Sequence, residues 1–377
     1  MIVVGAMSVI SWGFLTSLGA GAVFAWAGCL AIHRRRKNGR RSGRRRGRRV
    51  VISMVAALAL VLSLASAADA VNAHYQYMPR VADVVGERTW PTANVADLTS
   101  PRPSINQVSR SVSRHTRPTR SHPRGAVVKI HVNATGVGFD GDTVLVYLPP
   151  QYFTDDASHF PVVYLLHGSP GIPIDWLRGG GAAHAGFVAA AANHPQILVI
   201  PPVSRNWLDD SECVDGVHTR VETYLIHDVV PAVDAQLRTL PDAAHRTVAG
   251  MSAGGYCALN LGLRNRTVFG SIVDMSGYTH PTHAGGMAAL FGHRADLQQV
   301  VAANSPDIYV DHLKPTPPTR LYLLCGTDDG GALRQMIAIR DRLRTRGFAV
   351  TWVTRPGGHT YGVWRPGLVG ALTFTPK

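Results

Sequence analysis

A serine between glycines is the residue of this sequence that most clearly indicates chemistry. Residues 250–254 read GMSAG and fit the pattern G-x-S-x-G, in which the serine occupies a sharp turn between a strand and a helix. An apolar stretch precedes the motif and an amphipathic stretch follows it. The pattern therefore predicts that the Ser252 hydroxyl is exposed at the end of a strand, where it can act as a nucleophile.

A serine hydroxyl is a weak nucleophile at neutral pH, so it needs a base within hydrogen-bond reach and a carboxylate that orients this base. Two later segments supply such groups, LYLLCGTDDGG and VTWVTRPGGHTYGVW. His359 is the predicted base, because Gly357 and Gly358 leave the chain free to bend toward the serine. Asp328 and Asp329 are both candidates for the acid. We favour Asp329, and Asp328 would then be a surface charge or a helix cap.

The tetrahedral intermediate of acyl transfer also needs donors for its oxyanion, which are usually backbone N–H groups. One would come from Ala253, and the second from the loop in VVYLLHGSPGIPIDW, where we choose Ser169. His167 is either a buried residue that shapes this loop, which we favour, or a second catalytic imidazole. Aromatic residues in the loops expected around the pocket are candidate substrate contacts, although packing is their commoner role: Trp176, Trp207, Tyr361 and Trp364.

Three cysteines follow the N-terminal third of the chain, at positions 213, 257 and 325. Cys213 lies in a loop expected at the same edge as the serine, and Cys257 lies about one helical turn past the serine. The two can form a disulfide outside the cytoplasm, or all three can be small buried thiols, and both interpretations stay open. The cysteines do not have the spacing of a metal-ligand set. No metal or organic cofactor is expected.

Short β-branched runs that alternate with helical stretches after Gly125 must position these residues. Several runs are uniformly apolar, which is typical of strands covered on both faces by helices. The sequence therefore predicts an α/β domain with a mostly parallel sheet between helices. The predicted strands are Val127–Val132, Thr143–Leu148, Val162–Leu166, Ile197–Ile200, Thr247–Gly250, Ser271–Asp274, Leu321–Cys325 and Val350–Thr354. The predicted helices are Ala182–Asn193, Val221–Leu240, Ala253–Leu263 and Leu333–Arg346.

The N-terminal third is strongly basic. Ten Arg and one Lys lie between His33 and Arg49, and eight more Arg lie between Ala73 and Arg124. The chain carries a formal charge of +14, but residues 125–377 carry only about −1, so the basic balance says nothing about the partner of this domain. Uncharged segments flank the first arginine run, Ile2–Ile32 and Val50–Ala68, and each is long enough to span a bilayer.

The first arginine run has two interpretations. It could bind nucleic acid, or it could be the cytoplasmic loop of a transmembrane hairpin, and we favour the loop because short cytoplasmic loops are rich in Arg. Both chain ends then lie outside the cytoplasm. Val50–Ala67 could instead be a secretory signal cleaved after Ala67, and the domain would be secreted. The predicted parts are a membrane anchor of two helices over 1–72, a Pro-, Arg- and Ser-rich linker over 73–124 and a catalytic domain over 125–377.

Several segments together resemble the putative-esterase branch of the α/β-hydrolases, which includes esterase D-like enzymes, feruloyl esterases and mycolyltransferases. They are YLLHGSPG, ETYLIHDVVPAVDAQLRTL, GMSAGGYCALNLGL, DMSG, CGTDD and GGHTYGVWRPGL. The resemblance covers nearly all of residues 125–377 and implies an α/β-hydrolase fold. It implies Ser252 as nucleophile, Asp329 as acid and His359 as base. It also implies backbone oxyanion donors at Ser169 and Ala253.

The expected protein is thus a membrane-tethered, extracytoplasmic serine esterase that hydrolyses carboxylic esters through an acyl-enzyme. Two alternatives stay open. The acyl-enzyme could pass its acyl group to a sugar or lipid hydroxyl, which would make the protein an acyltransferase, or the fold could serve a non-catalytic envelope protein. The anchor makes envelope lipids or glycolipids candidate substrates, and no nucleic-acid partner is expected.

Overall fold

The computed structural model describes residue 16 and residues 19–27, 45–78, 92–94 and 122–376. The chain divides into two compact units, Met1–Thr89 and Trp90–Lys377. Most of the first predicted span, of the arginine run and of the predicted linker lies outside the described residues. The second unit contains all of the strands and helices predicted after Gly125.

The first unit contains one long apolar helix, α3(Arg45–Tyr75). Its stretch Val50–Tyr75 has a mean hydropathy of 2.5, and among the described residues it is the one helix long and apolar enough to cross a membrane. Residues 19–27 are also helical, and the indole Nε1 of Trp26 donates a hydrogen bond to Ser63 Oγ of α3 at 3.2 Å. The part of the first predicted span that is described therefore lies beside the second.

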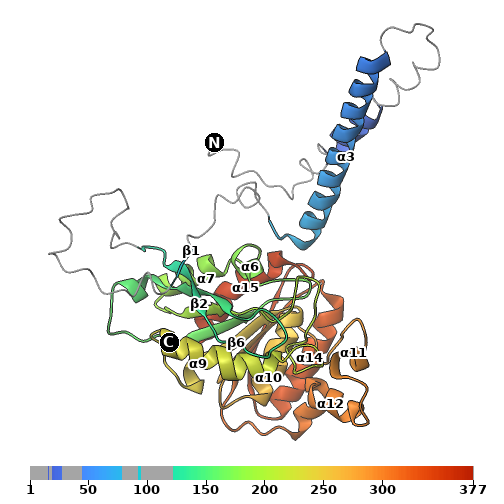
Figure 1. Ribbon diagram of the computed structural model, residues 1–377. Helices are drawn as coiled ribbons and strands as arrows, with labels where there is room; N and C mark the ends of the chain where they lie inside the picture. The colour runs from blue at the N-terminus through green and yellow to red at the C-terminus, as the bar shows by residue number, and fades with distance from the viewer. Residues whose placement is uncertain (1–15, 17–18, 28–44, 79–91, 95–121, 377) are drawn as a thin grey trace, which may run out of the picture. The chain divides into compact units, whose positions relative to one another are not determined.

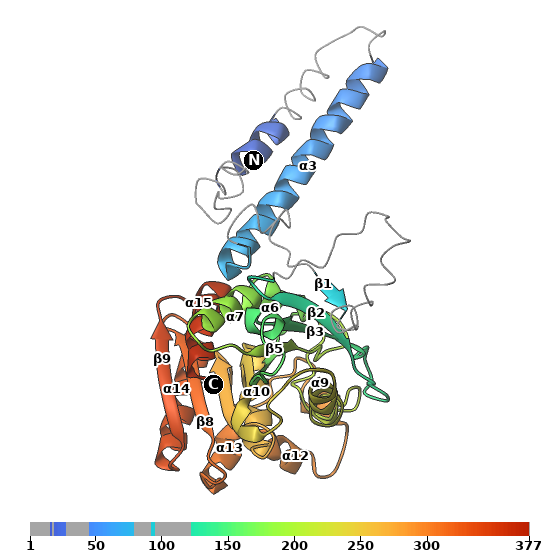
Figure 2. The same ribbon diagram turned by 90° about the vertical axis from the view of Figure 1, so that its left-hand side faces the viewer.

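The second unit is built on a nine-stranded sheet in the order β1-β2-β3-β5-β4-β6-β7-β8-β9. The six strands from β5 to β9 along this order are parallel, whereas β3 is antiparallel to both of its neighbours. Figure 2 shows β9 at one edge and β1 at the other. The strands are β1(Thr92–Asn94), β2(Ala126–His131), β3(Thr143–Leu148), β4(Val162–Leu166), β5(Ile197–Ile200), β6(Arg246–Met251), β7(Ser271–Met275), β8(Arg320–Gly326) and β9(Ala349–Arg355). All eight predicted strands are confirmed, each to within one residue at either end.

Helices connect most of these strands (Figure 1). The α-helices of this unit are α6(Ile174–Leu177), α7(Ala182–Ala191), α8(Val221–Thr223), α9(Val230–Gln236), α10(Ala253–Arg264), α11(Met287–Phe291), α12(Leu297–Ala303), α13(Pro306–Tyr309), α14(Gly330–Thr345) and α15(Tyr361–Phe374). Shorter helical turns are η2(Pro150–Phe153), η3(Tyr224–Val229), which is π-helical, η4(Ala243–His245) and η5(Val310–His312).

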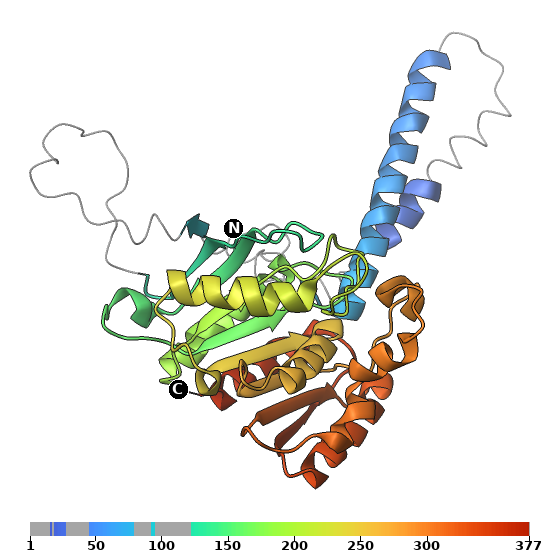
Figure 3. The ribbon, with the colours of Figure 1, turned by 60° about the horizontal axis from the view of Figure 1, so that its bottom comes forward.

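The predicted helix Val221–Leu240 is longer than the helical run in the structure. Figure 3 shows the helical run from α8 to α9 in yellow across one face of the sheet, and this run ends at Gln236. Leu237 is extended, with φ −128° and ψ 158°, because the chain turns there to form a β-bridge between Thr239 and Phe160. Leu237 is buried although it lies after the end of the helix.

Two hydrophobic clusters fill the two faces of the sheet, which explains why the strands are apolar throughout. One cluster joins α7 and α15 to the sheet, and the other joins the α8–α9 run, α10 and α14 to it. Successive residues of β4 alternate between them: Val163 and Leu165 belong to the first cluster, and Tyr164 and Leu166 to the second. A strand buried on both faces needs apolar side chains at every position.

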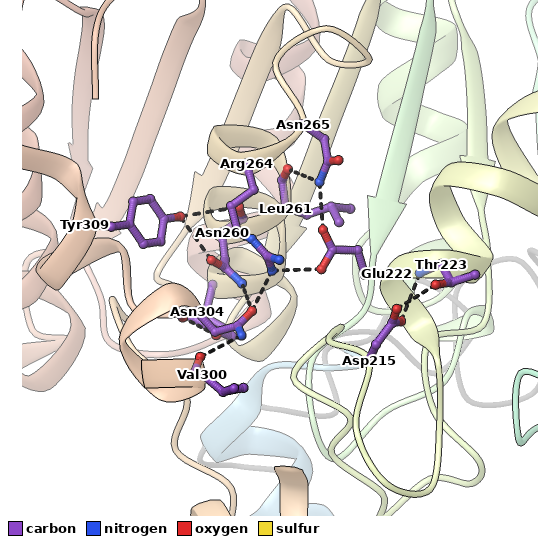
Figure 4. Close-up of polar contacts among 11 residues, drawn as sticks. Asp215, Glu222, Thr223, Asn260, Leu261, Arg264, Asn265, Val300, Asn304 and Tyr309 are labelled. Atoms are coloured by element: carbon purple, nitrogen blue, oxygen red, sulfur yellow. Dashed lines mark hydrogen bonds and ion pairs between the residues drawn. The ribbon is translucent and has the colours of Figure 1, made fainter. Parts of the chain in front are cut away.

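A polar network fixes the C-terminal half of α10 (Figure 4). Arg264 donates hydrogen bonds to Glu222 Oε2 at 2.8 Å and to Asn304 Oδ1 at 2.6 Å. The Tyr309 hydroxyl donates to Asn260 Oδ1 at 3.0 Å. These bonds tie α10 to α8 on one side and to the segment of α12 and α13 on the other. The network thus holds the helix that begins directly after the candidate nucleophile.

Candidate active site

Ser252 occupies the turn between β6 and α10. Its φ of 58° and ψ of −126° place it in a region that residues other than glycine rarely adopt. The turn is held by a hydrogen bond from Ser252 N–H to Met275 O at 2.9 Å. Only glycine fits two residues on, because a Cβ on Gly254 would lie 2.2 Å from Leu166 O. The backbone thus has the strained strand-to-helix turn that the sequence motif predicts.

Three side chains from separate loops meet at this turn. His359 Nε2 lies 2.7 Å from Ser252 Oγ, and His359 Nδ1 lies 2.7 Å from Asp329 Oδ2. The serine follows β6, the aspartate follows β8 and the histidine follows β9. Since these strands are parallel, their carboxyl ends share one edge of the sheet. In this geometry Nε2 can take the serine proton while the Nδ1–H donates to the carboxylate.

The acid beside His359 is Asp329. Burial raises the pKa of this carboxyl, but hydrogen bonds and charge interaction with His359, helped by the Ser276 hydroxyl, outweigh it, so the pKa lies below its ordinary value. Asp328 is exposed, and its Oδ1 accepts a hydrogen bond from the Thr327 hydroxyl at 3.1 Å. Of the two predicted candidates, the structure brings only Asp329 to the imidazole.

The end of β7 connects the nucleophile to the acid. Met275 O accepts the hydrogen bond from Ser252 N–H, and the next residue, Ser276, donates its N–H to Leu324 O of β8 at 2.8 Å. Ser276 has a φ of 57°, so the chain bends sharply at this point. One short segment therefore contacts both the turn of the nucleophile and the strand that precedes the acid.

The loop after β4 lies against the nucleophile. A Cβ on Gly168 would be 3.3 Å from Ser252 Cβ, so a larger residue would crowd the serine. Ser169 and Ala253, the two predicted oxyanion donors, line the same small cavity of about 10 Å³. The N–H of Ala253 belongs to the first turn of α10, where a backbone N–H has no acceptor within the helix. The loop after β4 and the start of α10 therefore lie next to each other at this cavity.

His167 is buried, and both of its ring nitrogens are engaged. Nδ1 is 2.9 Å from Gly168 O, and Nε2 accepts a hydrogen bond from Val203 N–H at 3.3 Å. Burial lowers the pKa of this imidazole. His167 is thus the loop-shaping residue that we favoured, and it is not placed to act as a second base.

The four aromatic candidates have different surroundings. The prediction of Trp176 as a substrate contact is wrong, because this side chain is 0% exposed and lies in the core beside α7. Trp207 is 55% exposed. The ring of Trp364 meets the His359 ring edge-on at 4.8 Å, and Tyr361 lies 5.2 Å from Trp364. Trp364 therefore packs against the imidazole, and Tyr361 packs against Trp364.

Cys213 and Cys257 form a disulfide, which decides between the two interpretations of the cysteines. Cys325 is a free, buried thiol. The disulfide ties the loop before α8 to α10, one turn after the nucleophile. Within residues 122–376 and the other described segments, no cluster of three His, Cys, Asp or Glu side chains could hold a metal ion.

Glu212 is a buried carboxyl beside the site that sequence reasoning missed. It is 1% exposed, its Oε2 accepts a hydrogen bond from the Tyr278 hydroxyl at 3.0 Å, and its Oε1 accepts one from Thr282 N–H at 2.5 Å. Burial, together with the nearby Asp210 carboxyl, raises its pKa to about 8. The acidic stretch DDSEC next to Cys213 was the available signal, because that loop was already expected at this edge.

Comparisons with known proteins agree with this geometry. The profile of the family described as "Putative esterase" matches residues 141–375. An uncharacterized protein of Corynebacterium glutamicum is 26% identical over 330 residues, which are 84% of this chain and 74% of that protein. An esterase of Mycobacterium tuberculosis is 27% identical over 260 residues, which are 58% of this chain and 52% of that protein. The solved structure of a ferulic acid esterase has a TM-score of 0.54 and 25% identity, and the match covers 62% of this chain and 90% of that one.

Proposed function

This chain belongs to the putative-esterase family of the α/β-hydrolases and is a carboxylic ester hydrolase, and on that premise we propose that it is a serine esterase. The observation that carries this proposal is the placement of His359 at 2.7 Å from both Ser252 Oγ and Asp329 Oδ2. Names of its relatives support an ester substrate, since one is an esterase and another is a ferulic acid esterase.

The proposed reaction proceeds through an acyl-enzyme. Ser252 Oγ attacks the ester carbonyl carbon while His359 Nε2 takes the hydroxyl proton, and Asp329 stabilises the imidazolium that forms. The bond between the carbonyl carbon and the alcohol oxygen then breaks, and His359 delivers its proton to the departing alcohol. In the second half, water attacks the carbonyl carbon of the acyl-serine while His359 takes a proton from it. The bond between this carbon and Ser252 Oγ then breaks, His359 returns the proton to Oγ, and the carboxylic acid is released.

The oxyanion of each tetrahedral intermediate would be bound by the N–H groups of Ser169 and Ala253. Ser169 and Ala253 line one cavity, and they follow Gly168 and Ser252, which lie against each other; both observations support this assignment. A donor of this kind contributes about 10²- to 10³-fold to turnover, because its charge interaction is preorganised in a site shielded from water. The close approach of the chain at Gly168 is then required for catalysis.

We further propose that the esterase domain is held at the outer side of a membrane. The helix Val50–Tyr75 supports a membrane anchor. The arginine run before this helix supports a cytoplasmic location for the N-terminal end of the helix. The Cys213–Cys257 disulfide supports an oxidising compartment for the esterase domain. Envelope lipids or glycolipids would be within reach of such a domain.

Two assays on separate samples test the proposal: labelling with a fluorophosphonate probe, and hydrolysis of p-nitrophenyl acetate. Wild-type protein should be labelled and should release p-nitrophenol, and Ser252→Ala should do neither while unfolding at the same temperature. A folded wild type that shows neither behaviour would mean that the fold serves a non-catalytic envelope protein. A sugar or lipid alcohol is added in a further assay. If the acyl group then appears on the added alcohol, the protein is an acyltransferase.

A further inference from the structure

Three large apolar side chains stand exposed on the loops that follow β4 and β5. They are Ile172, Trp207 and Leu208, which are 37%, 55% and 73% exposed, and we name them the apolar rim. Within residues 122–376 the other exposed large apolar side chains are scattered along the chain, at Val217, Ile308 and Ile337. Apolar groups gathered beside a site usually mark the place where an apolar ligand binds.

The two loops of the apolar rim are joined to each other and to the oxyanion loop. Gly171 N–H donates a hydrogen bond to Trp207 O at 2.9 Å, which sets Ile172 beside the second loop. The Ser169 hydroxyl donates to Asp209 O at 3.4 Å. The apolar rim is therefore continuous with the backbone that would bind the substrate carbonyl.

Polar bonds hold the second loop in the shape that exposes its apolar residues. Arg205 NH2 lies 2.7 Å from Asp209 Oδ1, and Arg205 N–H donates to Asp209 Oδ2 at 2.9 Å. Asn206 Oδ1 accepts a hydrogen bond from Leu208 N–H at 3.0 Å. Trp207 and Leu208 are thus displayed by a braced turn.

The order of the strands tells which part of an ester would meet the apolar rim. His359 follows β9, and in the proposed reaction it protonates the departing alcohol, so the alcohol lies on the β8 and β9 side of Ser252. The apolar rim follows β4 and β5, which lie on the other side of β6. The carbonyl oxygen would point toward the N–H groups of Ser169 and Ala253, so the first acyl carbon points away from His359 and from these donors. A long acyl chain then reaches the apolar rim by passing over the oxyanion loop, to which the rim is joined.

We propose that the apolar rim binds the acyl chain of the substrate and makes long-chain, lipid-type esters the preferred substrates. The assignment rests on the proposed esterase function. Its physical basis is the removal of acyl methylene groups and of the rim side chains from water. A short acyl group such as acetyl would not reach the apolar rim and would gain nothing from it.

The test compares kcat/KM for p-nitrophenyl octanoate and p-nitrophenyl acetate. The double variant Trp207→Ser/Leu208→Ser should lower the octanoate-to-acetate ratio at least about tenfold, because it removes most of the apolar surface that the longer chain buries. Leu208→Ser alone should lower the ratio in the same direction. The control Ile308→Ser, at a residue 52% exposed on α13, should leave the ratio unchanged.

Each outcome decides a separate point. A ratio unchanged in the double variant, with wild-type hydrolysis of both esters, would overturn the role of the apolar rim and leave the esterase proposal intact. Wild-type protein that hydrolyses neither ester would overturn the esterase proposal and, with it, the role of the apolar rim. Thermal unfolding checks that the double variant and Leu208→Ser are folded. If the double variant is not folded, Leu208→Ser supplies the test.

Discussion

Asp329→Asn is expected to reduce kcat for p-nitrophenyl acetate about 10⁴-fold, because it reverses the hydrogen bond that orients His359. The carboxylate now accepts the Nδ1–H at 2.7 Å, which leaves Nε2 free to take the serine proton. An amide in the same place can donate to Nδ1, and the imidazole proton then moves to Nε2. With Nε2 protonated, the base is lost although the three side chains remain in place.

The size of this loss follows from the burial of the carboxylate. Asp329 is 8% exposed, so water cannot easily replace the carboxylate. Its pKa lies below the ordinary value, so the carboxylate is charged throughout the neutral range and supports the imidazolium at every assay pH. A 10⁴-fold loss corresponds to about 5.5 kcal/mol of transition-state stabilisation.

The assay measures kcat and the rate of fluorophosphonate labelling, with thermal unfolding as a check of folding. Asp328→Asn is the matched control, because Asp328 is exposed and contacts Thr327. It should change kcat by less than about twofold, as is usual for a surface substitution. A folded Asp329→Asn that keeps a tenth of the wild-type kcat, or an equal loss in the control, would refute the assignment of the acid.

Three further predictions concern stability. The pKa of Glu212 is raised from 4.5 to about 8, so its contribution to stability is full below pH 4.5 and is lost as the pH rises to 8. The Tm of the wild type should therefore fall from pH 5 to pH 9, and the Tm of Glu212→Gln should fall less. Equal dependence of Tm on pH in the two proteins would contradict this role. Cys213→Ser/Cys257→Ser opens a link across 44 residues and should lower the free energy of unfolding in urea by about 4 kcal/mol, and a loss below about 1 kcal/mol would count against it. Gly254→Ala should destabilise the fold by about 3 kcal/mol in the same assay, because the new Cβ overlaps Leu166 O; wild-type stability would exclude that contact.

The strands of the second unit could be predicted because burial on both faces leaves a simple signal. In β4 every residue is buried, so the run is apolar without interruption. Helix α15 was not predicted, because Pro366 and three glycines make YGVWRPGLVGAL a weak helix former. Its packing against α7 within the core stabilises it in spite of this composition. Strand β1 is three residues long and carried no periodic signal.

The meeting of Ser252, Asp329 and His359 could be expected from the G-x-S-x-G motif and the predicted sheet, because each residue follows a parallel strand. The surroundings of single side chains could not. Trp176 was expected in a pocket loop, but a four-residue helix carries it into the core. The pairing of Glu212 with Tyr278 joins residues 66 positions apart, which no local pattern reveals.

The bend at Met275 and Ser276 also divides the following chain into a part that the catalytic geometry requires and a part that it does not. The required part ends within a few residues of the bend. Residues 283–296 make none of the hydrogen bonds that fix the serine or the acid. Leu290 and Phe291 of this stretch pack against Val214, next to Cys213. A change of its length would therefore disturb the disulfide loop first and leave the hydrogen bonds of the reaction centre in place.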